Sequence, residues 1–309
     1  MTESQVNLLH WFRQHAASQI VLGNQKRAAR VIEGAVEFAR RNTTEDDENA
    51  GEFFEILVTA AGRHLHAGEN EEAANLYREA LALTERPQVN IETLVLAEAQ
   101  QHLGVALDRE GNDAEAVENF EQALAAMLSV DPQPVESIAN LSNNLGMLWR
   151  NLSDYPKAEK HYQDSLEIFN DLGQSHALDA ATVCNNLGTL YWAWRQPAMA
   201  RDFHLQALKI RREHLPDTHP DVGQTACNLA AVYHDLGDFE KASFNYERAL
   251  KILRPNVKAD PETYEIVASN YADLLDEHNQ SARATKLRTQ TAKRIAKLKG
   301  GAKSNQSAA

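Results

Sequence analysis

Four asparagines recur at a constant interval of 42 residues, namely Asn144, Asn186, Asn228 and Asn270. A carboxamide offers both hydrogen-bond donors and an acceptor, so it can pair with the C=O and the N–H of an extended peptide without contacting the peptide's side chains. One such residue in each unit of a regular array would form a ladder along a groove. The alternative is that each asparagine bonds a neighbouring helix. We favour the ladder, which predicts that this face binds a partner segment.

Other side chains share a helical face with these asparagines. Because a helix turns about 100° per residue, Met147 and Arg150 fall on the same side as Asn144. For Asn143 and Asn185, a bond to a neighbouring helix is the favoured role. The complete set of candidate partner-binding residues, with the corresponding places in the next units, is Asn143, Asn144, Met147, Arg150, Asn185, Asn186, Trp192, Asn228, His234 and Asn270.

Acidic side chains outnumber basic ones along this face. The bases are His102, Arg109 and Arg150, and the acids are Asp108, Asp235, Asp273, Asp276 and Glu277. Electrostatic complementarity therefore favours a neutral or basic partner segment.

The C-terminal segment has the opposite charge. Residues 1–277 carry 23 bases and 44 acids, a net charge of −21, whereas the eight charged residues after Glu277 are all basic. Leu287, Ala292, Ile295 and Leu298 recur between them at helical spacing, and a basic amphipathic helix can lie on an anionic membrane or an acidic protein surface. The alternative is a capping helix whose bases offset the acidic body. The candidate residues for an anionic surface are Lys286, Arg288, Lys293, Arg294, Lys297 and Lys299.

Motifs for catalysis, metals and cofactors are absent from the sequence. There is no P-loop, no GxGxxG, no HExxH and no GxSxG. His64 and His66 are two residues apart on a predicted helix and face different ways, so they cannot share a metal ion. Cys184 and Cys227 are interpreted as reduced thiols. We therefore expect no enzymatic activity, no metal site and no cofactor.

The asparagines must be positioned by helices that repeat with the same period. The runs SNNLGMLW, CNNLGTLY, CNLAAVYH and SNYADLLD place a small residue two positions after each asparagine. The segment after Gly237 places Ala242, Tyr246, Ala249 and Leu250 at helical spacing, and earlier units follow the same pattern. Small residues allow two helices to approach closely while large ones fill the gaps beside them. The sequence predicts an all-α fold, a right-handed solenoid of antiparallel helix pairs.

The turns between paired helices follow the same frame. Residues Gly68, Gly111, Ser153, Arg195, Gly237 and Asn279 are spaced 43, 42, 42, 42 and 42 residues apart. We predict a degenerate capping repeat and acidic linker over 1–52, the repeat array over 53–281, and a basic capping helix with a flexible end over 282–309. Trp11 and Phe12 are expected in the core of the N-terminal cap.

The paired asparagines, the KAE-type second helix and the THPDV loop resemble the tetratricopeptide repeats of kinesin light chain. The resemblance is closest from Asn140 to Ile252, and the length and layout are most similar to the bacterial kinesin light chains. It implies a non-enzymatic adaptor that binds an extended segment of a partner protein in the concave groove. It also implies a tubulin-like filament as one partner, linked to another protein or to a membrane surface.

Composition narrows the classes of function. The net charge of −13 argues against nucleic acid as a principal partner, because phosphate contacts need a basic face. There is no run of 18 apolar residues, and the start MTESQVNLLHWF has no basic segment or cleavage site, so we expect a cytoplasmic protein. Two alternatives to the filament adaptor stay open: a regulator that binds a short signalling peptide, and an assembly chaperone or scaffold without a cytoskeletal role.

Overall fold

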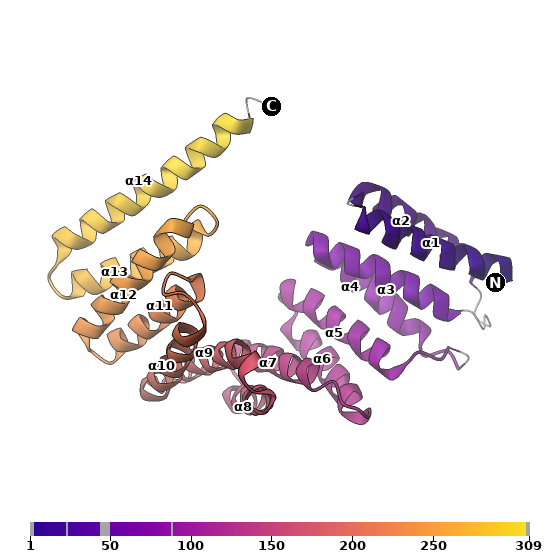
Figure 1. Cartoon of the computed structure of the whole chain (residues 1–309), viewed down its shortest axis with the longest axis horizontal. Helices are drawn as coiled ribbons and strands as arrows, with labels where there is room; N and C mark the ends of the chain where they lie inside the picture. Colours follow the sequence, from indigo (N-terminus) through magenta and orange to yellow (C-terminus); the bar gives the residue numbers. More distant parts are fainter. Residues whose placement is uncertain (1–2, 23, 44–49, 88, 307–309) are drawn as a thin grey trace. The chain divides into compact units, whose positions relative to one another are not determined.

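The computed structural model describes residues 3–22, 24–43, 50–87 and 89–306. These residues form fourteen α-helices and two short 3-10 turns, and no strand is found among them, which confirms the all-α prediction. Consecutive helices pack as antiparallel pairs (Figure 1). The chain divides into two compact units, Met1–His161 and Tyr162–Ala309.

The first unit contains seven complete helices and the start of an eighth. These are α1 (Glu3–Val21), α2 (Gln25–Asn42), α3 (Ala50–Ala67), α4 (Asn70–Leu83), α5 (Thr93–Arg109), α6 (Asp113–Ser129), α7 (Val135–Asn151) and the first part of α8 (Tyr155–Leu172). The second unit contains the rest of α8, η1 (Gln174–His176), α9 (Ala177–Ala193), α10 (Pro197–His214), α11 (Pro220–Asp235), α12 (Phe239–Leu253), η2 (Arg254–Asn256), α13 (Pro261–Glu277) and α14 (Ser281–Gln306).

Each predicted turn residue has a left-handed backbone. The φ angle is 78° at Gly68, 77° at Gly111 and 73° at Gly237, and the other three turns adopt it with a side chain: Ser153 at 64°, Arg195 at 60° and Asn279 at 58°. A positive φ ends a helix and lets the chain reverse, and glycine adopts it without steric strain. The turns therefore keep one geometry although the residue type changes.

The core of each helix pair is a small residue that faces a large one. A Cβ added at Gly104 would lie 2.5 Å from the ring of Phe120, and one added at Gly188 would lie 2.6 Å from the ring of His204. Tyr162 and Tyr246 fill the same place in neighbouring pairs and are fully buried. Because the backbones approach this closely, the first helix of each pair keeps a fixed face toward its second helix and another toward the surface.

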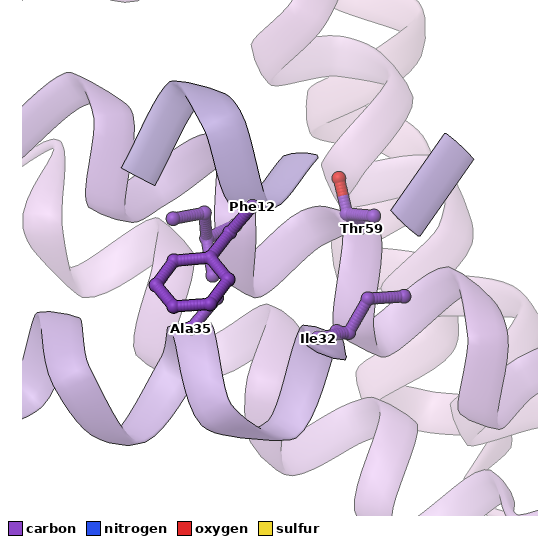
Figure 2. Close-up of a pocket in the computed structure, with 5 residues that line it drawn as sticks. Phe12, Ile32, Ala35 and Thr59 are labelled. Carbon is purple, nitrogen blue, oxygen red and sulfur yellow. The ribbon is translucent and has the colours of Figure 1, made fainter. Parts of the chain in front are cut away.

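The N-terminal pair differs from the expectation for its aromatic residues. The side chain of Trp11 is 50% exposed and stacks on His15, so its prediction as a core residue is wrong. Phe12 packs against Phe38 and lines a cavity of about 10 Å³ with Ile32, Ala35, Ile56 and Thr59 (Figure 2). A cavity of this volume is about the size of one water molecule, so it is a packing defect and not a ligand site.

The C-terminal helix is longer than the sequence pattern indicates. Its periodic apolar residues end at Leu298, but α14 continues to Gln306, through residues that were expected to form a flexible end. No proline stands between Leu298 and Gln306 to stop the helix, although Gly300 and Gly301 disfavour it. The division at residues 52 and 281 stays a prediction.

Candidate partner-binding site

An open hollow lies on the first helices of the N-terminal unit. Its volume is about 720 Å³. Helix α3 supplies most of the lining residues, α4 contributes Tyr77 and α5 contributes His102. His102 stacks on Tyr77 with 5.8 Å between the ring centroids. His102 stands 42 residues before Asn144, so it occupies the place of the periodic asparagines in an earlier repeat. The lining residues are Val58, Thr59, Gly62, Arg63, His66, Ala67, Tyr77 and His102.

Burial sets the chemistry of this hollow. It lowers the pKa of His102, a shift that Glu98 opposes and His66 reinforces, and it raises the pKa of Tyr77 to about 12. Both side chains are therefore neutral near pH 7. The arrangement suits an apolar side chain of a ligand, with imidazole and guanidinium groups at the edge to bind its polar neighbours.

Helix α7 carries the next three candidates in the same unit. Asn144, Met147 and Arg150 are half-buried. Arg150 donates to Asn151 over 3.1 Å, whereas the Asn144 carboxamide has no hydrogen-bond partner among the residues that the structure describes. Asn143 has an interaction within the chain. The donors and the acceptor of the Asn144 carboxamide are therefore not used by the described residues.

In the second unit, a chain of hydrogen bonds joins carboxamides of α9 and α11. The Asn185 Oδ1 accepts from the Asn228 Nδ2 over 3.1 Å and lies 3.2 Å from the Nδ1 of His204. Gln224 donates in turn to Asn228 over 3.2 Å. Asn228 therefore bonds a neighbouring helix but retains a second donor hydrogen and a second lone pair. Asn186 also has an interaction within the chain.

Trp192 and His234 link one first helix to the next. The indole Nε1 of Trp192 donates to Asp235 of α11, and the Nε2 of His234 lies 2.7 Å from the Oε2 of Glu277 of α13. In both cases the partner is 43 residues further along the chain. These contacts hold α9, α11 and α13 at a fixed separation, while Trp192 remains 41% exposed.

At the C-terminal end, Asn270 is half-buried on α13 and has no hydrogen-bond partner in the described parts of the chain. Two acids of the same helix are paired: Arg288 of α14 lies 2.6 Å from Asp273 and 2.5 Å from Asp276. These bonds raise the pKa of Arg288 and lower that of Asp276. Arg288 is therefore held by the protein's own acids.

The remaining bases of α14 are placed differently. Lys286, Lys293 and Lys297 are exposed, and Arg294 lies over the ring of Tyr264 at 5.7 Å. The side chain of Lys299 lies outside the described residues. Three of the four apolar residues between these bases are turned inward: Ile295 is buried, and Leu287 and Leu298 pack against the same core, whereas Ala292 is exposed. This inward orientation is what the alternative prediction, a capping helix, requires.

Known proteins with similar sequences and structures identify the family of this chain. Family models described as tetratricopeptide repeat match residues 97–126, 137–213 and 223–253. The solved structure of BtubC (BKLC) from P. vanneervenii is 31% identical, with a TM-score of 0.58, and the alignment covers 75% of this chain and 91% of that one. The chain belongs to the kinesin light chain-like tetratricopeptide repeat proteins.

Two curated relatives come from Arabidopsis thaliana. KINESIN LIGHT CHAIN-RELATED 2 is 25% identical and KINESIN LIGHT CHAIN-RELATED 1 is 20% identical, each over 75% of this chain. The chain spans 34% and 37% of their lengths, about a third of each. The predicted tetratricopeptide fold and the resemblance to kinesin light chain are thus confirmed.

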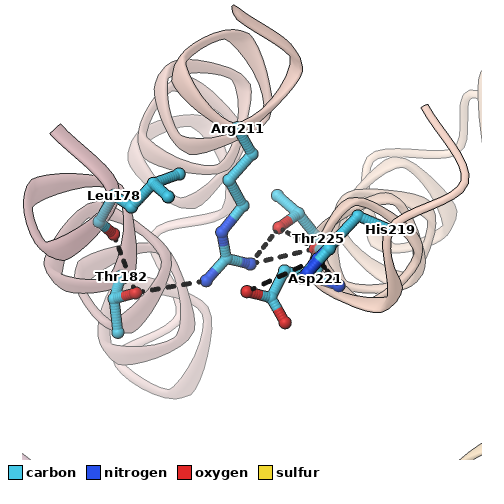
Figure 3. A network of polar contacts seen from close by, with 6 residues as sticks. All are labelled: Leu178, Thr182, Arg211, His219, Asp221 and Thr225. Carbon is cyan, nitrogen blue, oxygen red and sulfur yellow. Dashed lines mark hydrogen bonds and ion pairs between the residues drawn. The ribbon is translucent and has the colours of Figure 1, made fainter. Parts of the chain in front are cut away.

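Arg211 is a buried cation of this tetratricopeptide protein. Its neighbours Arg212 and Glu213 are exposed, as charged residues usually are, but Arg211 is only 6% exposed. Its guanidinium donates to the Asp221 carbonyl over 3.0 Å, to the Thr225 hydroxyl over 2.5 Å and to the Thr182 hydroxyl over 3.4 Å (Figure 3). Burial lowers its pKa, and Asp221 and Cys184 oppose that shift.

The repeat frame contains the signal that would have identified this residue. Met127, Phe169 and Leu253 stand at the same place in other repeats and are all buried. An arginine at that place must therefore be buried too, and it requires oxygen acceptors from both neighbouring helices. Arg211 joins α9, α10 and α11 in this way.

Other reactive groups are shielded. Cys184 and Cys227 are buried free thiols, and burial raises their pKa to about 11 and about 12. A thiol with so high a pKa is a poor nucleophile.

No cluster of metal-ligating side chains occurs in the described ranges. None of the described helices combines the length and the apolar composition that a membrane span requires.

Proposed function

We propose that this chain is a non-enzymatic adaptor that binds an extended segment of a partner protein across the first helices of its repeats. The observation that carries the proposal is the hollow of about 720 Å³ on α3, α4 and α5. Ligand pockets in proteins have about this volume, and they combine apolar walls with a few polar groups. The hollow takes one apolar side chain of the segment.

The asparagines supply the contacts to the backbone of the segment. The carboxamide of Asn144 in the first unit has no hydrogen-bond partner among the described residues, and the same holds for Asn270 in the second unit. Asn228 has one donor and one lone pair to spare. Hydrogen bonds of this kind recognise an extended chain whatever its sequence, so the choice of partner depends on the hollow.

The charge of the segment is less constrained than the sequence indicated. The expectation of a neutral or basic partner depended on acids that the structure pairs internally: Asp235 with Trp192, Glu277 with His234, and Asp273 and Asp276 with Arg288. Arg288 offsets part of the negative charge of Asp273 and Asp276, whereas Trp192 and His234 engage Asp235 and Glu277 by hydrogen bonds. Recognition by the apolar hollow is therefore the stronger element of the proposal.

Selection from a random peptide library tests this function. Peptides selected on the full chain should lose at least about tenfold in affinity for the Ala67→Trp variant, because the indole fills the hollow. Ala125→Trp adds the same side chain at an exposed position of α6 and should leave the affinity unchanged. Equal affinity for both variants would refute binding in the hollow.

The identity of the partner is a further step of the proposal. The resemblance to bacterial kinesin light chain supports a tubulin-like filament. In a pelleting assay, the chain should sediment with polymerised tubulin-like protein and stay in the supernatant without it. If the chain does not sediment with the filaments even at low salt, the filament is not its partner, and the adaptor binds a partner of another class, such as a signalling peptide or an assembly client.

A further inference from the structure

Five of the bases of α14 fall into two groups that the sequence does not separate. Arg283 and Arg288, near its start, pair with acids of α12 and α13: Arg283 lies 2.9 Å from Glu247, and Arg288 bonds Asp273 and Asp276. Lys293, Arg294 and Lys297, further along, form no ion pair within the described part of the chain.

A residue distant in sequence joins the second group. Arg254 of η2 and Gln290, Lys293, Arg294 and Lys297 of α14 line one hollow of about 510 Å³. We call it the basic hollow. Four of its five lining residues are cations and none is an acid. On a chain of net charge −13, this is a concentrated region of positive charge.

The fold holds these cations in place. Leu253, next to Arg254, and Ile295, next to Arg294, are both buried in the same hydrophobic core. Arg294 is further restrained by its contact with the ring of Tyr264. Because the backbone on both sides of the basic hollow is anchored, the four cations stem from one small area of surface, and a bound anion would relieve their mutual repulsion.

We propose that the basic hollow binds an anion that carries several phosphate groups. Two guanidinium groups offer planar pairs of donors that match phosphate oxygens, two ammonium groups add charge, and the Gln290 amide adds a neutral donor. The four positive charges match a ligand of about four negative charges, which a chain of phosphates supplies and a single carboxylate does not. The site shares no residue with the groove, so it stands independently of the proposed function.

Titration calorimetry with tripolyphosphate on the full chain tests this site at roughly 0.1 M salt, where distant charges are screened. The double variant Arg254→Gln/Lys297→Gln should weaken binding at least about tenfold. The matched control Lys286→Gln/Lys160→Gln removes the same charge from exposed positions outside the hollow and should change affinity less than about twofold. An equal loss in both variants would overturn the proposal.

Further ligands separate phosphate chemistry from charge, and free phosphate from lipid-bound phosphate. Citrate and pyrophosphate each carry about three negative charges near neutral pH, so pyrophosphate should bind more tightly than citrate if the guanidinium groups match phosphate oxygens. Equal binding of the two would show that the hollow does not recognise phosphate. Vesicles with phosphorylated lipid headgroups should compete with tripolyphosphate for the same residues. Vesicle binding without any binding of tripolyphosphate would overturn the site as proposed.

Discussion

The buried histidine of α10 predicts an acid-sensitive fold. His204 is 1% exposed, packs against Gly188, and burial lowers its pKa from 6.5 to about 4, with Arg211 adding to the shift. Since the pKa is lower in the folded than in the unfolded protein, the unfolded state binds more protons between these values. Stability is therefore lost as the pH falls from 6.5 toward 4.

The size of this loss follows from the shift in pKa. Each unit corresponds to about 1.4 kcal/mol, so the complete effect is about 3 kcal/mol below pH 4 and about 2 kcal/mol at pH 5. The variant His204→Phe removes the titrating group. Its ring should fit, because Phe120 packs against Gly104 at the same place in an earlier repeat. The hydrogen bond to Asn185 is lost, but Asn185 still accepts from Asn228.

Urea denaturation followed by circular dichroism measures the difference. Between about pH 7.5 and pH 5, the unmodified chain should lose about 2 kcal/mol more stability than His204→Phe. Protonation of carboxylates affects both proteins and cancels in the comparison. His214→Phe removes an exposed histidine of the same helix as a control. Equal losses in the unmodified chain and His204→Phe, or an equal gain in the control, would refute the reasoning.

Three further predictions follow from single residues. Arg211→Met places an apolar side chain where Met127 stands in another repeat, so unfolding in urea should show stability unchanged or raised by up to about 2 kcal/mol; a large loss would show that the buried cation stabilises the fold. Arg195→Gly should raise the free energy of unfolding by up to about 1 kcal/mol, and with it the melting temperature, because glycine adopts the φ of 60° at this turn without steric strain. Asn144→Ala with Asn270→Ala should weaken binding of a selected peptide by about 0.5–1.5 kcal/mol for each lost bond, with unchanged melting; a melting change without a binding change would make both residues structural.

The repeat frame was predictable because it depends on backbone geometry and side-chain size. The turn residues have positive φ from Gly68 to Asn279, and Ala242, Tyr246 and Ala249 are buried as their helical spacing predicts. Both properties are local or belong to one helix pair. A constant spacing of 42 residues therefore fixes them before any contact is known.

The polar contacts were less predictable. Periodicity assigns a residue to a face, but it does not say which acceptor lies across the interface. Arg288 was expected on a solvent-facing basic surface and instead bonds Asp273 and Asp276, since all three lie on adjacent helices. Trp11 was expected in the core, but periodicity does not say which face of its helix the neighbouring helices α2 and α3 cover. The basic hollow was not predictable from the sequence pattern, because Arg254 lies 36 residues before Gln290 and only the fold brings the two together.

Photo-crosslinking tests the central claim most directly. A photoreactive residue replaces His102 in the hollow in one variant, and exposed Glu118 of α6, a second helix, in another. Each variant is mixed with a selected peptide and irradiated, and the crosslinked products are mapped by mass spectrometry. If the first helices bind the partner segment, crosslinks form from position 102 and not from position 118. Crosslinks from position 118 alone would contradict the account.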